Sequence, residues 1–385
     1  MQVTRLKFLG ASLLLVFTIS CNSSVNLWGK KTAHELYADK IENSPDGQQW
    51  ITVSKKTLET PHGIQLPYSH FGYFPRGRPR ALTLEFTARQ GEKIVIDLKK
   101  TVQESFVLYA DLFEKKGPEL SHIGSTDTTK TQLGLDVDEA STYLLRLQPE
   151  LNGSSSYNLN ISVAPSLIFP VAGSKANAGS FWGDDREAGK RKHEGIDIFA
   201  PKLTPVLAAA DGYVTGVSEG GLGGKTIWMK VDNKKIHLYY AHLDRQLVEE
   251  GQRVKEGDTL GLVGNTGNAK FAAPHLHFGI YNYNGAIDPW PFVNTSPKNA
   301  LPVKPKDLDM YLQVKAPTKK SDVTDDEMLV PLAVTDNRYV AETTDGKIIT
   351  VLFNSAKLVK NQKWETPATE KPKVVTVDRI TNSNN

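Results

Sequence analysis

The chain has 385 residues, of which 39% are hydrophobic and 23% are charged. These proportions are close to globular averages and exclude a collagen-like fibre, a coiled coil and a wholly disordered chain. Lysine and arginine number 46 against 43 aspartates and glutamates, which leaves a net charge of +3. So balanced a chain has no broad basic surface, and we expect no nucleic-acid partner. At about 150 residues per domain, the length predicts two or three domains.

The N-terminus has the composition of an export signal. Arg5 and Lys7 precede an apolar run over residues 8–19, which is shorter than the roughly 18 residues that span a membrane. A small residue then precedes Cys21, and this ending resembles a bacterial lipoprotein cleavage site, which implies that the Cys21 thiol carries lipid. Thr18 stands where such sites usually have leucine, so an uncleaved anchor or plain secretion is the alternative. We expect an exported protein of the bacterial cell envelope, facing the periplasm and held to a membrane by a lipid anchor.

Composition and turn residues divide the chain into segments of an all-β protein. Alternating apolar residues predict an antiparallel β-sandwich, a stretch rich in Pro and Lys predicts a solvated linker, and short strands after it are compatible with a Src-homology-type barrel. The polar segment after the signal predicts a leader or an extended first strand. The predicted segments are a lipoprotein signal over 1–21, a leader over 22–66, an accessory β-sandwich over 67–165, a site-bearing antiparallel β domain over 166–295, a linker over 296–327, a small β domain over 328–365 and a tail over 366–385.

Five of the nine histidines lie between His193 and His277, and this clustering marks the candidate site. His193 and Asp197 are four residues apart, and His275 precedes His277 by two, so on β-strands each pair points to one face. With Cys21 the only cysteine, imidazole and carboxylate groups are the available ligands, and they suit zinc. Three such ligands leave one position for a water whose pKa the metal lowers to about 7. Spacing alone leaves open whether His275 or His277 binds the metal. A single histidine on a strand is more often a structural residue than a metal ligand, so the prediction depends on the convergence of several.

Motifs over about residues 166–293 resemble the lysostaphin-type zinc endopeptidases and occur in that family's order. They are Phe169-Pro-Val-Ala-Gly173, Phe181-Trp-Gly183, His193-Glu-Gly-Ile-Asp197, Tyr240-Ala-His-Leu243, Gly264-Asn-Thr-Gly267 and Pro274-His-Leu-His-Phe278. The resemblance implies an antiparallel catalytic fold with a groove over the sheet. It also implies hydrolysis of peptide bonds in the stem peptides or cross-links of peptidoglycan.

The family's functional residues match positions of this sequence one by one. The resemblance implies that His193, Asp197 and His277 are the Zn²⁺ ligands, and that His242 and His275 handle the water and the tetrahedral intermediate. All five are present, whereas degenerate relatives that lost ligands act by activating amidases. The sequence therefore predicts a zinc metalloendopeptidase with peptidoglycan as its substrate. The alternative is a non-hydrolytic wall-binding lipoprotein or amidase activator that uses the same groove. The sequence does not identify a protein partner.

Four further residues are candidates for substrate binding. Arg186 and Arg191 could bind a peptide carboxylate through a guanidinium fork, although solvated surface is an equal alternative. Asn265 and Thr266 could border the groove, although a plain turn is the favoured interpretation. The other histidines have no partner in the sequence and are expected to carry no chemistry; they are His34, His62, His70, His122 and His237.

Three segments of the predicted sandwich resemble the jelly-roll pre-peptidase modules that accompany secreted bacterial peptidases. An unrelated β-sandwich is the alternative. The segments are 90–98, 141–147 and 153–161.

Overall fold

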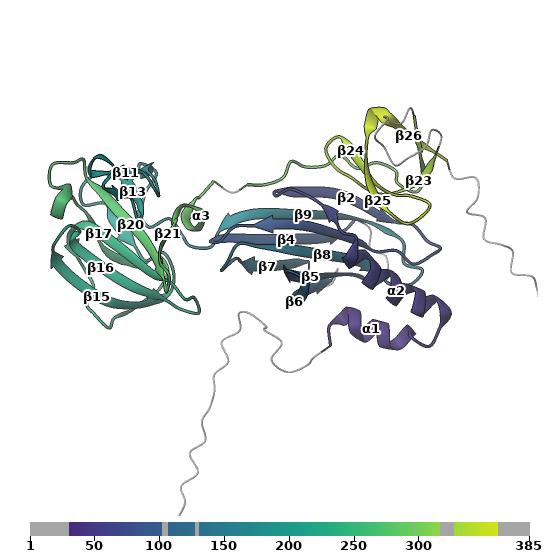
Figure 1. The fold of residues 1–385 in the computed structure, drawn as a ribbon, viewed down its shortest axis with the longest axis horizontal. Coiled ribbons are helices and arrows are strands. Elements are labelled where there is room, and N and C mark those ends of the chain that lie inside the picture. The colour runs from purple at the N-terminus through teal and green to yellow at the C-terminus, as the bar shows by residue number, and fades with distance from the viewer. Residues whose placement is uncertain (1–30, 102–106, 128–130, 297, 316–326, 361–385) are drawn as a thin grey trace, which may run out of the picture.

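The computed structural model of the protein describes residues 31–101, 107–127, 131–296, 298–315 and 327–360. Strands predominate in these residues and pair mainly antiparallel, which confirms the predicted all-β class. Figure 1 shows two bodies, one of which is formed by the central part of the chain. None of the described helices is long and apolar enough to cross a membrane. The predicted export signal with Cys21 and the predicted tail over 366–385 lie outside the described residues.

One body is a β-sandwich. Its strands are β1 (His62–Gly63), β2 (Tyr68–Phe74), β3 (Leu82–Ala88), β4 (Glu92–Lys100), β5 (Leu108–Lys116), β6 (Glu119–Asp127), β7 (Gln132–Asp136), β8 (Ser141–Pro149) and β9 (Ser155–Pro165). One sheet has the order β1-β3-β8-β5-β6, and the other contains β2-β9-β4-β7. Leu82, Leu84 and Phe86 alternate along β3, are at most 2% exposed, and lie in the core with residues of both sheets. The period of two in the sequence thus reflects one face of each strand packed inward.

Two helices, α1 (Ala33–Ile41) and α2 (Pro45–Glu59), occupy much of the segment over 22–66 for which the sequence analysis expected a leader or an extended strand. That prediction is wrong for these residues. A capping box begins α1, in which the side chains of Thr32 and Glu35 each accept from the other's backbone N–H. The Ser44 hydroxyl caps α2, whose first residue is a proline, a favourable arrangement at this position. Both start signals are therefore present in the sequence.

The second helix packs against the sandwich through one face. Gly47, Trp50, Ser54 and Thr57 are its buried residues, and their spacing of three or four positions places them on one side of the helix. Trp50 is 1% exposed, and its indole N–H donates to the carbonyl of Pro149 at 2.8 Å. Only one of these four residues is strongly apolar, so the helical period was not visible in the hydrophobicity of the sequence.

Trp50→Ala tests whether this helix is an integral part of the fold. Removing a fully buried tryptophan leaves a cavity, so we expect the free energy of unfolding to fall by about 3–5 kcal/mol. Urea denaturation followed by far-UV circular dichroism measures the loss. Leu36→Ala on α1, where the residue is 51% exposed, is the control and should change stability by less than about 0.5 kcal/mol. Equal midpoints for wild type and Trp50→Ala would contradict the packing.

The C-terminal strands extend the sandwich. They are β22 (Tyr311–Val314), β23 (Met328–Val334), β24 (Arg338–Glu342), β25 (Ile348–Leu352) and β26 (Ala356–Val359). In the larger sheet β23 pairs with β2, with Phe71 opposite Val334, and the order continues as β25-β24-β23-β2. The strands share a small core of their own, but that core includes Phe71. The described strands of the predicted small β domain over 328–365 thus have a core of their own and also continue the larger sheet of the sandwich.

The predicted linker over 296–327 contacts the sandwich in its described part and includes one strand. The backbones of Lys298 and Val163 exchange two hydrogen bonds of 3.1 and 3.2 Å, so the chain begins this segment alongside β9. The Ser69 hydroxyl donates to the carbonyl of Leu301 at 2.7 Å. Strand β22 then lies inside the same range and pairs with β23 and β26. These contacts hold the segment against the sandwich.

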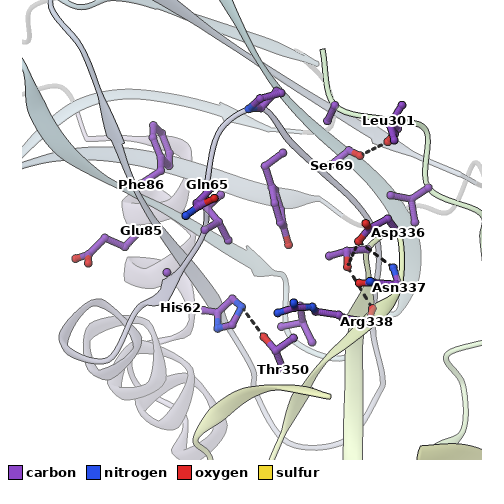
Figure 2. A pocket seen from close by; sticks show the side chains of 18 of the residues that line it. His62, Gln65, Ser69, Glu85, Phe86, Leu301, Asp336, Asn337, Arg338 and Thr350 are labelled. Carbon is purple, nitrogen blue, oxygen red and sulfur yellow. Dashed lines mark hydrogen bonds between the residues drawn. The ribbon is translucent and has the colours of Figure 1, made fainter. Parts of the chain in front are cut away.

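A hollow of about 900 Å³ lies where the sandwich meets the C-terminal strands (Figure 2). In Figure 2, His62 from β1 and Thr350 from β25 are joined across it by a hydrogen bond of 3.1 Å. Asn337 lines it from the turn between β23 and β24, Arg338 from the first position of β24, and Glu85 from β3. Residues nearly 300 positions apart in the sequence thus share one surface.

The central body is built on a ten-stranded sheet. Its strands are β10 (Asn177–Ser180), β13 (Ile196–Phe199), β14 (Pro205–Leu207), β15 (Gly212–Gly220), β16 (Gly224–Val231), β17 (His237–Gln246), β18 (Arg253–Val254), β19 (Thr259–Val263), β20 (His275–Asn282) and β21 (Gly285–Ile287). The main order is β10-β13-β20-β17-β16-β15-β18, and the short helix α3 (Trp290–Val293) ends the body. One face of β13, β16, β17 and β20 is fully buried, which leaves the opposite face of these strands for a site.

Candidate metal centre

Two adjacent strands place Asp197 and His277 side by side. Antiparallel β13 and β20 pair with these two residues directly opposite each other. Their neighbours Ile198 and Leu276 are 0% exposed and lie in the core, so the side chains of Asp197 and His277 point to the other face. His275, two residues before His277, lies on that same face and is 6% exposed.

His193 approaches this face from a loop. Its prediction on one strand with Asp197 is wrong, because β13 begins at Ile196. Gly195 lies between the two candidates, and a Cβ atom there would lie 2.7 Å from the ring of His277. The loop can pass this close to His277 only because position 195 has no side chain. The convergence of His193 with Asp197 thus depends on a glycine rather than on strand alternation.

Three ligand atoms form a small triangle. The Nε2 atom of His193 lies 3.0 Å from Nδ1 of His277 and 3.1 Å from Oδ1 of Asp197. The third edge, from His277 Nδ1 to Asp197 Oδ1, is 3.0 Å. Tetrahedral zinc with bonds of about 2.0–2.1 Å separates its ligand atoms by about 3.3 Å, so the triangle and its chemistry fit that ion. Among the described residues, this is the group of three found within metal-binding reach of one another.

Neighbouring groups orient two of the three side chains. Nδ1 of His193 lies 2.9 Å from the carbonyl of Phe181, which can only accept, so this nitrogen carries the hydrogen and Nε2 presents its lone pair to the triangle. Arg186 Nη2 donates to Oδ2 of Asp197 at 2.6 Å and to the Ser180 hydroxyl at 2.7 Å. The carboxylate is thereby held with Oδ1 toward the two imidazoles.

A bulge in β17 places His242 at the same site. Strict alternation would turn it toward the core together with Leu238 and Tyr240, which are both 0% exposed. The register between β16 and β17 shifts at this point, and His242 has a φ of +62°. Such a bulge redirects a side chain, and a left-handed backbone at a non-glycine residue is a conformation that the surrounding fold must impose. The ring of His242 then lies 5.0 Å from that of His275 and 5.9 Å from that of His277.

Backbone carbonyls determine which ring nitrogen of His242 and of His275 carries a hydrogen. Nδ1 of His242 is 3.0 Å from the carbonyl of Thr266, and Nδ1 of His275 is 2.8 Å from that of Ala273. Because a carbonyl only accepts, each Nδ1 carries a hydrogen, and each Nε2 is left with a lone pair when the ring is neutral. Nε2 of His275 lies 4.0 Å from Oδ1 of Asp197.

The surroundings also set the charges of the site. Burial, aided by the nearby His275 and His277, lowers the pKa of His242 to about 4. Burial would raise the pKa of Asp197, but the adjoining imidazoles of His193 and His277 outweigh it and hold that pKa well below its usual range. At neutral pH, therefore, Asp197 is a carboxylate, as a metal ligand must be, and His242 is uncharged.

The four candidate substrate-binding residues differ in their surroundings. Arg186 faces Asp197, whereas Arg191 is exposed on the other strand of the small hairpin formed by β11 (Asp185–Arg186) and β12 (Arg191–Lys192). The Thr266 hydroxyl donates to the carbonyl of Leu243 and accepts from the N–H of residue 225, so its single donor is used within the fold. Asn265 bonds carbonyls of its own loop at 3.4 and 3.5 Å. These contacts support the turn interpretation for Asn265 and Thr266.

Comparison with known proteins identifies the domain. Residues 191–289 match the model of Peptidase family M23, and this domain of the chain belongs to that family. Peptidoglycan DD-endopeptidase ShyC of Vibrio cholerae is 41% identical over 88 residues, which are 23% of this chain and 20% of that protein. L-Ala--D-Glu endopeptidase of Bacillus subtilis is 38% identical over 124 residues, covering 29% of this chain and 38% of the other. The crystallised catalytic domain of lysostaphin from Staphylococcus simulans is 30% identical, with coverage of 31% and 92% and a TM-score of 0.29.

The predicted resemblance to the lysostaphin-type family is confirmed for this domain, and all five candidate histidine and aspartate positions lie in the matched range. The chain spans only 20% to 38% of the length of the two curated relatives described above. The family match does not extend to the sandwich. The resemblance of the sandwich to pre-peptidase modules therefore stays a prediction.

Gly195→Ala tests how the triangle is built. An added methyl would collide with His277 and with the backbone carbonyl of Phe278, at 2.6 Å, so we expect the variant to lose most of its bound zinc while it remains folded. Zinc per protein is measured by atomic emission after dialysis. Gly63→Ala is the matched control, because nothing lies within 4 Å of a Cβ there, and it should keep the wild-type zinc content. Full zinc occupancy in Gly195→Ala would show that the close approach is not required.

Proposed function

We propose that the protein is a zinc-dependent endopeptidase that hydrolyses peptide bonds in the stem peptides or cross-links of peptidoglycan. The observation that carries the proposal is the triangle of His193, Asp197 and His277, with two further imidazoles within reach. The named endopeptidases among the relatives support the reaction, and their names support peptidoglycan as the substrate. An intact ligand set argues against the alternative of a wall-binding or amidase-activating protein without activity of its own.

His193, Asp197 and His277 are the proposed zinc ligands. When bound, zinc would activate a water for attack at neutral pH and polarise the carbonyl of the scissile bond. Arg186 donates a hydrogen bond to Oδ2 of Asp197, so Oδ1 remains available to the metal. This assigns Arg186 a positioning role in place of the recognition of a substrate carboxylate, because its guanidinium is already paired with Asp197.

Two histidines are proposed to move protons and stabilise charge. His242 is neutral at pH 7 and its Nε2 carries a lone pair, so it is the proposed acceptor of the proton from the attacking water and the later donor to the leaving amine. The ring of His275 lies 5.0 Å from that of His242, and its Nδ1 is held by a carbonyl. In its protonated form, its Nε2–H can donate to the oxyanion that forms from the scissile carbonyl.

We also propose the location that such a substrate requires. Peptidoglycan lies outside the inner membrane, so the protein would act in the periplasm or outside the cell. The predicted lipid anchor at Cys21 would hold the domain near the wall. Labelling cells with an alkyne fatty acid tests this anchor, since Cys21→Ser should abolish the labelling.

His242→Ala separates catalysis from metal binding. Loss of a general base typically costs two to four orders of magnitude, so we expect turnover to fall by about 10²–10⁴ while zinc content stays unchanged. His193→Ala should instead lose both the zinc and the activity. The assay is the release of soluble muropeptides from purified sacculi, with mass spectrometry to identify the bond that is cut. Wild-type rates in His242→Ala would refute its role.

Removal of the metal tests the zinc requirement directly. Dialysis of the wild type against a chelator should abolish muropeptide release, and stoichiometric zinc should restore it. Binding of the protein to sacculi without any release, whether or not zinc is present, would favour the non-hydrolytic alternative. Release that survives complete removal of zinc would contradict the proposal.

A further inference from the structure

A cluster of aromatic side chains lies on the same sheet face as the metal centre. Trp228 on β16, Tyr239 on β17 and Tyr281 on β20 are each half-buried, whereas the residue before each of them in its strand is in the core. Tyr281 follows His277 by four residues, so both point to one face at a separation of about 13 Å along the strand. The pairing register places Trp228 opposite Tyr239. The three rings therefore lie on the same sheet face as His277 and next to it.

The three rings contact one another and form a continuous surface. The ring centroid of Trp228 lies 4.5 Å from that of Tyr239 and 5.0 Å from that of Tyr281. The two tyrosine rings are 6.3 Å apart, and Tyr239 lies 6.0 Å from the imidazole of His277. We call Trp228, Tyr239 and Tyr281 the aromatic platform.

Two glycines lie beside the platform. Gly216 on β15 pairs with Trp228, and Gly279 on β20 pairs with Tyr239. Glycine weakens the interior of a strand, and it occurs there where a ligand or another backbone must approach closely. A Cβ atom at position 279 would lie 2.9 Å from the ring of Tyr281 and 3.3 Å from the backbone carbonyl of Glu194, so this glycine makes room for the loop before β13. A Cβ atom at position 216 would lie 3.8 Å from the ring of Trp228, and a larger residue there would extend over the ring.

The spacing of the rings decides which chemistry they suit. An ammonium group held in an aromatic cage lies between rings, each within about 6 Å of it, which requires rings well separated from one another. The rings here are in mutual contact at 4.5 to 6.3 Å and enclose no such space. A packed aromatic surface suits a flat, weakly polar partner, such as the C–H face of a pyranose ring, whose hydroxyl and amide groups stay in solvent at its edge.

We propose that the aromatic platform is a sugar subsite, on which an N-acetylated pyranose of the glycan strand stacks while an attached peptide reaches the metal centre. The inference rests on the proposed function and names a second part of the substrate. Polar groups stand at the far edge of the platform, where Lys230 and His237 pair across β16 and β17. They line an open hollow of about 810 Å³ together with Tyr283, which is 82% exposed. This hollow offers room and hydrogen-bond partners for a neighbouring sugar.

Binding of a sugar without a peptide tests the subsite independently of activity. The probe is the β-1,4-linked tetramer of N-acetylglucosamine, titrated into the zinc-loaded full chain and followed by NMR or calorimetry. We expect saturable binding that Trp228→Ala weakens about tenfold or more, the scale of losing one aromatic stacking partner. Trp228→Phe keeps a ring and should retain most of the affinity, and Leu120→Ala on the sandwich should change nothing. No binding by the wild type, or equal binding by Trp228→Ala, would overturn the proposal.

A comparison of two substrates relates the subsite to hydrolysis. Trp228→Ala should lower kcat/KM about tenfold on sacculi, chiefly through KM, and should leave hydrolysis of a sugar-free cross-linked stem peptide within about twofold of wild type. Equal losses on both substrates would show that the rings recognise the peptide and would overturn the sugar assignment. If the wild type cuts neither substrate, the proposed function fails, and the titration with the sugar tetramer still decides the subsite. Melting temperature and zinc content of each variant verify that the domain is intact.

Discussion

The register between β13 and β20 is the constraint on which the site depends. It sets Asp197 opposite His277 and, at the same time, directs Ile198 and Leu276 into the core. A slip of one residue would turn the carboxylate into the apolar core and the isoleucine onto the ligand face, and both changes would be unfavourable. Core packing therefore also fixes the position of the ligands. The same alternation places the aromatic platform in line with His277.

The site is formed where regular β-structure is interrupted. His193 precedes its strand and needs a glycine two residues later, and His242 reaches the ligand face through a bulge with a left-handed backbone. Such features are unfavourable in isolation, and the strands around them supply the packing that maintains them. The fold also orients the rings of His242 and His275, because the Nδ1 of each donates a hydrogen bond to a backbone carbonyl. The backbone orients the imidazoles, and their Nε2 atoms remain for chemistry.

Much of the fold was predictable, because alternation reports directly on strands with one buried face. Ile94, Ile96 and Leu98 are an example, since all three are 0% exposed. The helix α2 was missed because its buried face consists of Gly47, Trp50, Ser54 and Thr57, although Ser44 and the proline after it signal its start. The pairing of β2 with β23 joins residues more than 250 positions apart, and no local pattern encodes such a contact. For the site, motifs indicated which residues converge. The close approach at Gly195 and the bulge at His242 depend on contacts between distant segments, which no motif encodes.

The most direct test of the account is X-ray absorption at the zinc edge of the zinc-loaded protein. The account predicts one zinc per chain with nitrogen and oxygen neighbours at about 2.0–2.1 Å and the outer-shell scattering of two imidazoles. The His193→Ala protein should lose this spectrum together with its tightly bound metal. An unchanged spectrum in that variant, or zinc without imidazole scattering in the wild type, would contradict the claim that His193, Asp197 and His277 surround one ion.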